Sequence, residues 1–335
     1  MYRVIFFSLI IANIVGCKEE TQTVTTSPVT TPVTTPVTVP IKQACIDGQY
    51  TEPLPDTSKN IDDLVVSYKP ENAAAFIDQV LARRYPLGQQ LVTEGVASRH
   101  DCIAQYLRDK SSAKAVLNQL SLVVHECGHA ADGERSTFDE DTYIIKPSLV
   151  MAAKSGDTTT RGGLTFARGK ILADGYQAMR VPCGNNDSSP ACDFYAHTYL
   201  DGFSGEQGFN TLFEELVQYT NSLATDLAIS DKLQDRQITD RDGLLTFLWY
   251  VERYLHLARS NYPSAYQHLL TGDDGRWRRV ILTQWGRAWH FLKATETNPY
   301  LGIYDNAIMP LVMAPELLDE IQRLRDAEDG QCSLK

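Results

Sequence analysis

The residues best suited to chemistry lie close together, in the run His125-Glu126-Cys127-Gly128-His129, which is an HExxH motif. Residues four apart on an α-helix share a face, so the two imidazoles can bind one metal ion. Glu126 follows the first histidine and would lie beside that ion, where it can take a proton from a bound water. The motif therefore predicts metal-assisted hydrolysis, and the alternative is an ordinary helix with two surface histidines.

This chemistry requires the motif to lie on a helix, and its surroundings predict one over residues 112–132, with Gly133 as the stop. Cys127 lies two residues from each histidine, which turns it toward the core, so we expect a buried thiol or a disulfide there rather than a metal ligand. Apolar residues at three- and four-residue steps form the core-facing stripe of this helix: Ala113, Val116, Leu117, Leu120, Val124, Cys127 and Ala131.

A zinc ion bound by two histidines needs a third protein ligand and keeps its fourth position for water. A third histidine at the HExxHxxGxxH spacing of metzincins is excluded, because Asp132 and Arg135 occupy the glycine and histidine positions. Asp132 itself is an alternative ligand, although its offsets from the two histidines are more typical of a carboxylate at a helix end.

The favoured third ligand is a glutamate on a later helix, predicted over residues 209–224, which carries Glu214 and Glu215. Glu215 borders the apolar stripe of that helix. A carboxylate beside a buried face loses hydration unless it meets a cation, and metal ligation would supply one. Glu214 is a further alternative ligand, and a pair of solvated glutamates is the alternative to both. The stripe consists of Leu212, Leu216, Tyr219 and Leu223.

Together with the HExxH motif, Glu215-Leu-Val-Gln-Tyr219 resembles the gluzincin branch of zincin metallopeptidases, in which Glu-Leu-x-x-Tyr surrounds a glutamate ligand on a downstream helix. The resemblance implies a zinc peptidase with a mainly α, zincin-like α+β fold and a small sheet. It also implies His125, His129 and Glu215 as ligands. Two features depart from the thermolysin type: Tyr219 stands where its ExxxD pattern has aspartate, and the separation from His129 to Glu215 is longer.

The oxyanion formed during peptide hydrolysis needs a hydrogen-bond donor besides zinc, commonly a tyrosine or histidine. Tyr195, His197 and Tyr199 alternate just before the predicted glutamate helix. His197 and Tyr199 are the favoured candidate donors, and Tyr219 is a less favoured one. A structural role for all three is the alternative.

The N-terminal residues predict where in the cell the protein is located. Arg3 precedes an apolar run over residues 4–15, which has the length of a signal-peptide core and is too short to span a bilayer. Its end, Ile14-Val15-Gly16-Cys17, resembles a bacterial lipobox, which implies a signal peptide over residues 1–16 and a lipidated Cys17. Residues 17–44 are rich in Thr, Val and Pro and predict a semi-rigid stalk. The catalytic domain would then span residues 45–335 on a periplasmic or outer-membrane face.

The composition argues against one class of partner and indicates the redox compartment. The chain has 335 residues and a net charge of −11, which argues against a nucleic-acid partner because phosphate binding needs a basic surface. Cysteine usage suits an oxidising compartment, and Cys183 and Cys192 flank a turn-rich loop that predicts a disulfide.

The remaining pattern is mainly helical. Helices are predicted over residues 61–84, ending before Pro86, over residues 101–108, and over most of the chain after Gly205, including residues 244–257. Residues 142–145 and 164–166 predict short strands.

Near the C-terminus, an apolar face is expected to pack in the core, with the neighbouring arginines largely off it. That face consists of Trp277, Ile281, Trp285, Ala288, Trp289 and Leu292, and the arginines are Arg276, Arg278, Arg279 and Arg287.

The sequence therefore predicts a zinc-dependent peptidase, anchored to a bacterial envelope membrane, that acts on peptide or protein substrates with Glu126 as general base. One alternative is a non-catalytic envelope binding or assembly lipoprotein with a structural or vestigial zinc site. Another is a hydrolase of non-peptide amides.

Overall fold

The computed structural model describes residues 50–98, 101–155, 166–174, 180–184, 189, 192–233 and 238–328. The chain separates into two units, Met1–Ala44 and Cys45–Lys335, and the described residues all belong to the second. The predicted signal peptide, Cys17 and the stalk lie outside the described residues. The second unit is mainly helical with one small sheet, as the sequence predicts.

The first half of this unit is built from short helices. In chain order they are α1 (Asp62–Ser67), η2 (Pro70–Asn72), α2 (Ala73–Arg84), α3 (Pro86–Ala97), α4 (Cys102–Tyr106), α5 (Ala113–Leu117) and α6 (Leu120–Arg135). The helix predicted over residues 61–84 is thus divided, because Lys69 before Pro70 is extended, the conformation that a following proline favours. Pro86 ends α2 as expected, but it also opens α3, which the sequence analysis missed.

The motif helix also differs from the prediction. It is divided at Asn118 and Gln119 into α5 and α6, and it continues past Gly133 to Arg135. Gly133 does not stop the helix because it lacks the positive φ of a glycine cap. The end is instead marked by Ser136, whose backbone N–H and hydroxyl both donate to the carbonyl of Asp132, at 2.9 and 2.8 Å.

A two-stranded antiparallel sheet follows, formed by β1 (Glu140–Lys146) and β2 (Leu149–Lys154), with Ile144 opposite Val150. β1 contains the predicted strand. The second predicted strand is wrong at Phe166, which has no strand conformation, while residues 164 and 165 lie outside the described residues. The actual partner strand follows β1 directly.

The second half consists mostly of long helices that bury the core. In chain order the elements are η3 (Arg168–Ala173), α7 (Tyr195–Tyr199), α8 (Gly202–Gly205), α9 (Phe209–Ala228), η5 (Ser230–Lys232), α10 (Asp240–Asn261), α11 (Pro263–Leu270), η6 (Gly272–Gly275), α12 (Arg276–Ala294), α13 (Asp305–Val312) and α14 (Pro315–Asp326). This confirms the helical prediction after Gly205.

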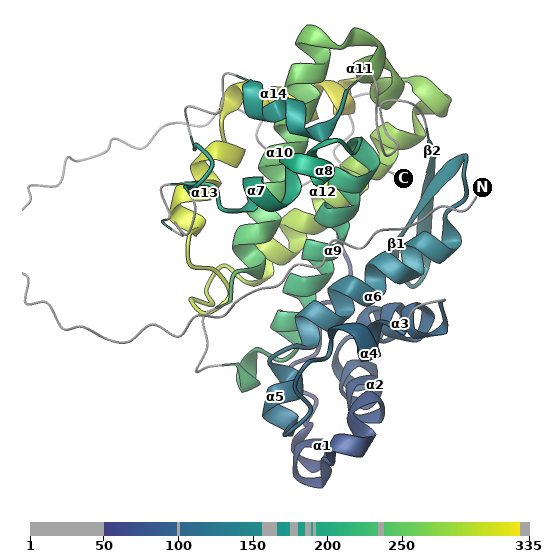
Figure 1. The fold of residues 1–335 in the computed structure, drawn as a ribbon, viewed down its shortest axis with the longest axis vertical. Helices are drawn as coiled ribbons and strands as arrows, with labels where there is room; N and C mark the ends of the chain where they lie inside the picture. The colour runs from purple at the N-terminus through teal and green to yellow at the C-terminus, as the bar shows by residue number, and fades with distance from the viewer. Residues whose placement is uncertain are drawn as a thin grey trace, which may run out of the picture. The chain divides into compact units, whose positions relative to one another are not determined.

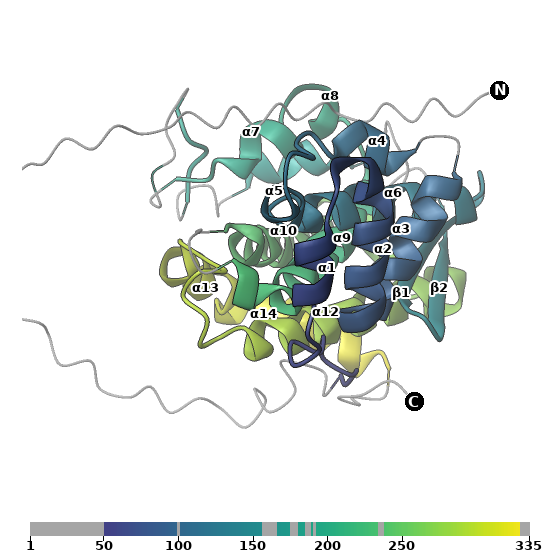
Figure 2. The same cartoon turned by 90° about the horizontal axis from the view of Figure 1, so that it is seen from below.

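The arrangement places α6 between α3 and α9, and α9 packs in turn on α10 and α12 (Figure 1). Seen from below, α1 and α2 lie in front of α6 and α9 (Figure 2). The face of α12 predicted as core is buried. Arg287 was predicted largely off that face and is nevertheless fully buried, because its guanidinium donates to the Tyr85 hydroxyl at 3.0 Å and pairs with Glu52.

Two disulfides are present among the described residues. Cys183–Cys192 is the predicted bridge. Cys102–Cys127 joins α4 to the centre of α6, which confirms that Cys127 turns away from the histidine face. Such bridges are typical of proteins that fold in oxidising compartments.

Candidate metal centre

Two neighbouring helices bring three potential ligands together. His125 and His129 come from α6 and Glu215 comes from α9, and one ligand atom of each lies within 4.8 Å of the others. The Nε2 atoms of the two imidazoles are 3.1 Å apart. Oε2 of Glu215 lies 3.3 Å from Nε2 of His125 and 3.6 Å from Nε2 of His129. This triangle of one carboxylate oxygen and two ring nitrogens could hold a metal ion.

The Glu215 carboxylate has the environment of a ligand. Its Oε2 atom is buried and has no hydrogen-bond partner of normal geometry among the described residues. Burial opposes ionisation, but the imidazoles of His129 and His125 outweigh it and hold the pKa of Glu215 far below its usual range. The site thus keeps a charged carboxylate whose buried Oε2 atom faces two ring nitrogens.

The opposite nitrogens of the two rings are held by α9. Nδ1 of His129 lies 2.9 Å from Oε1 of Glu214, and Nδ1 of His125 lies 3.1 Å from Oγ of Ser222. Contacts of this kind orient metal-binding imidazoles and fix their tautomer. Glu214 therefore lies outside the ligand triangle, which corrects its place as an alternative ligand. Ser222 was missed, although it lies two helical turns after Glu215 on the same face of α9.

Asp132 also lies outside the triangle. Its Oδ1 accepts the backbone N–H of Ile144 at 2.9 Å, and its Oδ2 accepts the Gln218 amide at 2.8 Å. Burial raises the pKa of Asp132 to about 8, although the bond from Ile144 opposes this shift. Asp132 therefore ties α6 to β1 and α9, and it is not an alternative ligand in this structure.

Gly128, inside the motif, packs tightly against the Gln218 side chain of α9. A Cβ atom on Gly128 would lie 2.0 Å from Oε1 of Gln218. That oxygen already accepts a hydrogen bond of 2.9 Å from Asn221. A side chain at this position would displace the Gln218 amide and so disturb its hydrogen bonds with Asp132 and Asn221.

Glu126 is half-buried, and its carboxylate contacts Tyr106 of α4. The Tyr106 hydroxyl forms a hydrogen bond with the Glu126 carboxylate, and burial together with that carboxylate raises the pKa of Tyr106 above its usual range. Tyr106 lies one turn after Cys102, whose disulfide to Cys127 holds α4 against the motif. Tyr106 could not be found from the sequence, because its proximity to Glu126 depends on that pairing.

The predicted oxyanion donors fall into two groups. Tyr199 is close to the centre: its hydroxyl lies 3.1 Å from that of Tyr219, whose ring packs edge-on against His125 at 4.9 Å between centroids. His197 points elsewhere, with Nε2 at 2.5 Å from the carbonyl of Cys183 and Nδ1 at 4.0 Å from Asp201. The contacts of His197 connect it to the disulfide loop, so the structure does not bring it to the ligand triangle.

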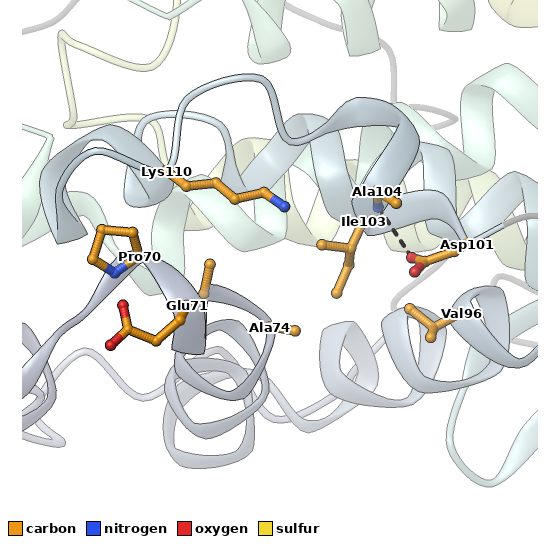
Figure 3. A pocket seen from close by; sticks show the side chains of 9 residues that line it. Pro70, Glu71, Ala74, Val96, Asp101, Ile103, Ala104 and Lys110 are labelled. Carbon is orange, nitrogen blue, oxygen red and sulfur yellow. Dashed lines mark hydrogen bonds between the residues drawn. The ribbon is translucent and has the colours of Figure 1, made fainter.

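A pocket of about 170 Å³ lies apart from these residues, among η2, α2, α3 and α4. Ile103 lies at its centre between Lys110 and Val96 (Figure 3). None of the three potential ligands lines it, and Asp101 beside it caps α4 by accepting the Ala104 N–H at 3.0 Å.

Comparisons of the chain with protein-family models, with curated proteins and with solved structures found no match. No helix in the described ranges combines the length and apolar character that crossing a membrane requires.

Proposed function

We propose that this chain is a zinc-dependent peptidase attached to a bacterial envelope membrane by a lipid on Cys17. The observation that carries the proposal is the triangle of His125, His129 and Glu215, formed by an HExxH helix and a downstream helix. The neighbouring Glu126 supports a catalytic rather than a structural site, because a purely structural site has no use for a carboxylate beside its first histidine.

The donor set and its spacing suit zinc. Ligand atoms bonded to a tetrahedral zinc ion lie about 3.3 Å from one another. The corresponding separations here are 3.1, 3.3 and 3.6 Å. Two neutral imidazoles and one carboxylate are also a common ligand set for catalytic zinc with a fourth, open position. The unpartnered Oε2 of Glu215 gains a partner when the ion binds.

Bound zinc would lower the pKa of a water molecule and polarise the scissile carbonyl. Glu126 takes the proton of the attacking water and delivers it to the leaving amine as the C–N bond breaks. Tyr106 fixes the orientation of the Glu126 carboxylate through its hydroxyl. Tyr199 and Tyr219 share one hydrogen bond, so the pair keeps one free hydroxyl proton near His125 for the negative charge that develops on the carbonyl oxygen.

Hydrolysis of a fluorogenic peptide library by the full chain in detergent, with one equivalent of zinc, tests this function. The expected result is cleavage that falls at least about 100-fold in Glu126→Gln while bound zinc is unchanged. Glu134→Gln, an exposed glutamate on the same helix, is the matched control and should retain full activity. Zinc binding without cleavage of any peptide would favour the non-catalytic lipoprotein instead.

A further inference from the structure

Arg168 is a buried cation at the start of the short helix η3. Its side chain belongs to a residue that is only 3% exposed. No carboxylate among the described residues lies within ion-pair distance of it, unlike the buried Arg84, Arg253 and Arg287. Buried arginines are normally paired, because removing a charge from water is costly. The guanidinium of Arg168 can therefore still bind an anionic group.

The side chain is held rigidly at the start of α9. The Arg168 backbone N–H donates to the Gln207 carbonyl at 2.7 Å, and Nε donates to the Ser204 carbonyl at 2.7 Å. Nη1 lies 3.3 Å from the Thr211 hydroxyl oxygen. That hydroxyl donates its own proton to the Gly208 carbonyl, so it is an acceptor for Arg168. These two side-chain contacts use two of the five guanidinium donors, and the geometry is fixed before any ligand arrives.

This position is next to the metal centre. Thr211 and Glu215 are four residues apart on α9, so they share a face and lie about 6 Å apart along the helix axis. The guanidinium carbon also lies 5.9 Å from the centre of the Tyr199 ring, and the Tyr199 hydroxyl contacts Tyr219 beside His125. Burial lowers the pKa of Arg168, while Glu215 is the largest influence raising it, which agrees with this proximity.

We propose that Arg168 binds a carboxylate of the peptide substrate and thereby selects the bond to be cut, an inference that rests on the proposed peptidase function. A guanidinium fork matches a carboxylate with two parallel charge-assisted hydrogen bonds. The carboxylate is either the free C-terminus, which makes the enzyme an exopeptidase, or an Asp or Glu side chain near the scissile bond. Lysine cannot replace the fork, so Arg168→Lys should retain only part of the preference.

The test uses N-acetylated peptide libraries with a free C-terminal acid and with a C-terminal amide, digested by the zinc-loaded full chain. The proposal predicts that the wild type cleaves the free acids at least about 100-fold faster, or cleaves at a fixed distance from Asp or Glu and not from Asn or Gln. Arg168→Met should abolish that preference. Lys170→Met, an exposed cation two residues away, should keep it.

A binding measurement separates this inference from the peptidase function. Equilibrium dialysis of the same libraries against zinc-loaded Glu126→Gln protein should enrich carboxylate-bearing peptides, and adding Arg168→Met should remove the enrichment. The role of Arg168 would be overturned, with the peptidase intact, by a protein that retains Arg168 but cleaves and retains acid and amide forms equally and shows no preference for Asp or Glu over Asn or Gln. Enrichment without cleavage by the wild type would overturn the peptidase function alone. Far-ultraviolet circular dichroism of Arg168→Met distinguishes loss of recognition from loss of folding.

Discussion

Oε1 of Glu214 lies 2.9 Å from Nδ1 of His129, on the side of the ring opposite the nitrogen that faces Glu215. Two consecutive glutamates on α9 thus approach the same imidazole from its two ends. Burial lowers the pKa of His129, but Glu215 and then Glu214 outweigh it and raise that pKa well above its usual value. Glu214 orients the ring, and Glu215 completes the ligand triangle.

Loss of the Glu214 contact should weaken metal binding without abolishing it. Glu214→Ala leaves Nδ1 of His129 without its acceptor, so we expect the zinc affinity to fall about 10- to 100-fold. Competition with a chromophoric chelator measures this change. Glu206→Ala, at an exposed position before α9, is the control that should bind zinc as the wild type does. An unchanged affinity in Glu214→Ala would show that the contact does not support the site.

Gly128 should tolerate no side chain. Gly128→Ala places a methyl group against the Gln218 amide, and the overpacking should lower the free energy of unfolding by about 1–3 kcal/mol. Urea unfolding of the metal-free protein measures this value, because zinc then adds nothing to either variant. Gly133→Ala makes the same substitution on the same helix at a half-buried position without positive φ, and it should lose no stability. Equal behaviour of the two variants would contradict the tight packing of the Gln218 amide against Gly128.

The disulfide between Cys102 and Cys127 should stabilise the unit that carries the motif. It closes a loop between cysteines 25 positions apart. Replacing both cysteines by alanine should lower the free energy of unfolding by about 3 kcal/mol, because the unfolded chain regains the freedom of that loop. Chemical unfolding with and without reductant measures the contribution of this disulfide to the free energy of unfolding. The reductant should destabilise the wild type more than the variant. The same loss in both would mean that this bridge contributes nothing.

A buried glutamate far along the chain should make stability depend on pH. Burial, and then the carboxylate of Glu320, raises the pKa of Glu252 well above its ordinary value of 4.5, and both Glu252 oxygens are buried without a partner among the described residues. The folded state therefore keeps this proton at pH values where the unfolded chain releases it. Stability from this group is present below pH 4.5 and is lost as the pH rises toward the folded-state pKa.

Glu252→Gln removes that dependence. The stability of the variant relative to the wild type should rise by up to about 1.4 kcal/mol for each pH unit above 4.5 within that window. Urea unfolding at several pH values between 5 and 8 measures the difference, and metal binding affects both proteins alike. A difference that stays constant with pH would refute the buried, protonated state of Glu252.

The local part of the site was predictable from the sequence. His125 and His129 share a face because helix periodicity alone determines it, and Glu215 was found because it borders an apolar stripe at helical spacing. The mainly helical fold followed from the same periodicity. The break between α5 and α6 was not predicted, because the apolar pattern continues across it.

Contacts that depend on tertiary pairing were not predictable. The six cysteines other than Cys17 allow fifteen pairings, so the bond that brings Tyr106 to Glu126 had no signature in the sequence. Arg168 begins a short 3-10 helix without a periodic pattern, and its place beside α9 depends on packing. His197 was chosen for its residue type and its position before α9, and neither fixes the direction of a side chain.

The most direct test of the central claim is the metal content of the purified full chain, measured by elemental analysis after exposure to zinc and removal of the excess. We expect one tightly bound zinc ion per chain, and its loss in both His129→Ala and Glu215→Ala while their circular dichroism spectra keep the helical signal. A wild-type chain without stoichiometric zinc, or variants that retain it in full, would contradict a metal centre formed by α6 and α9.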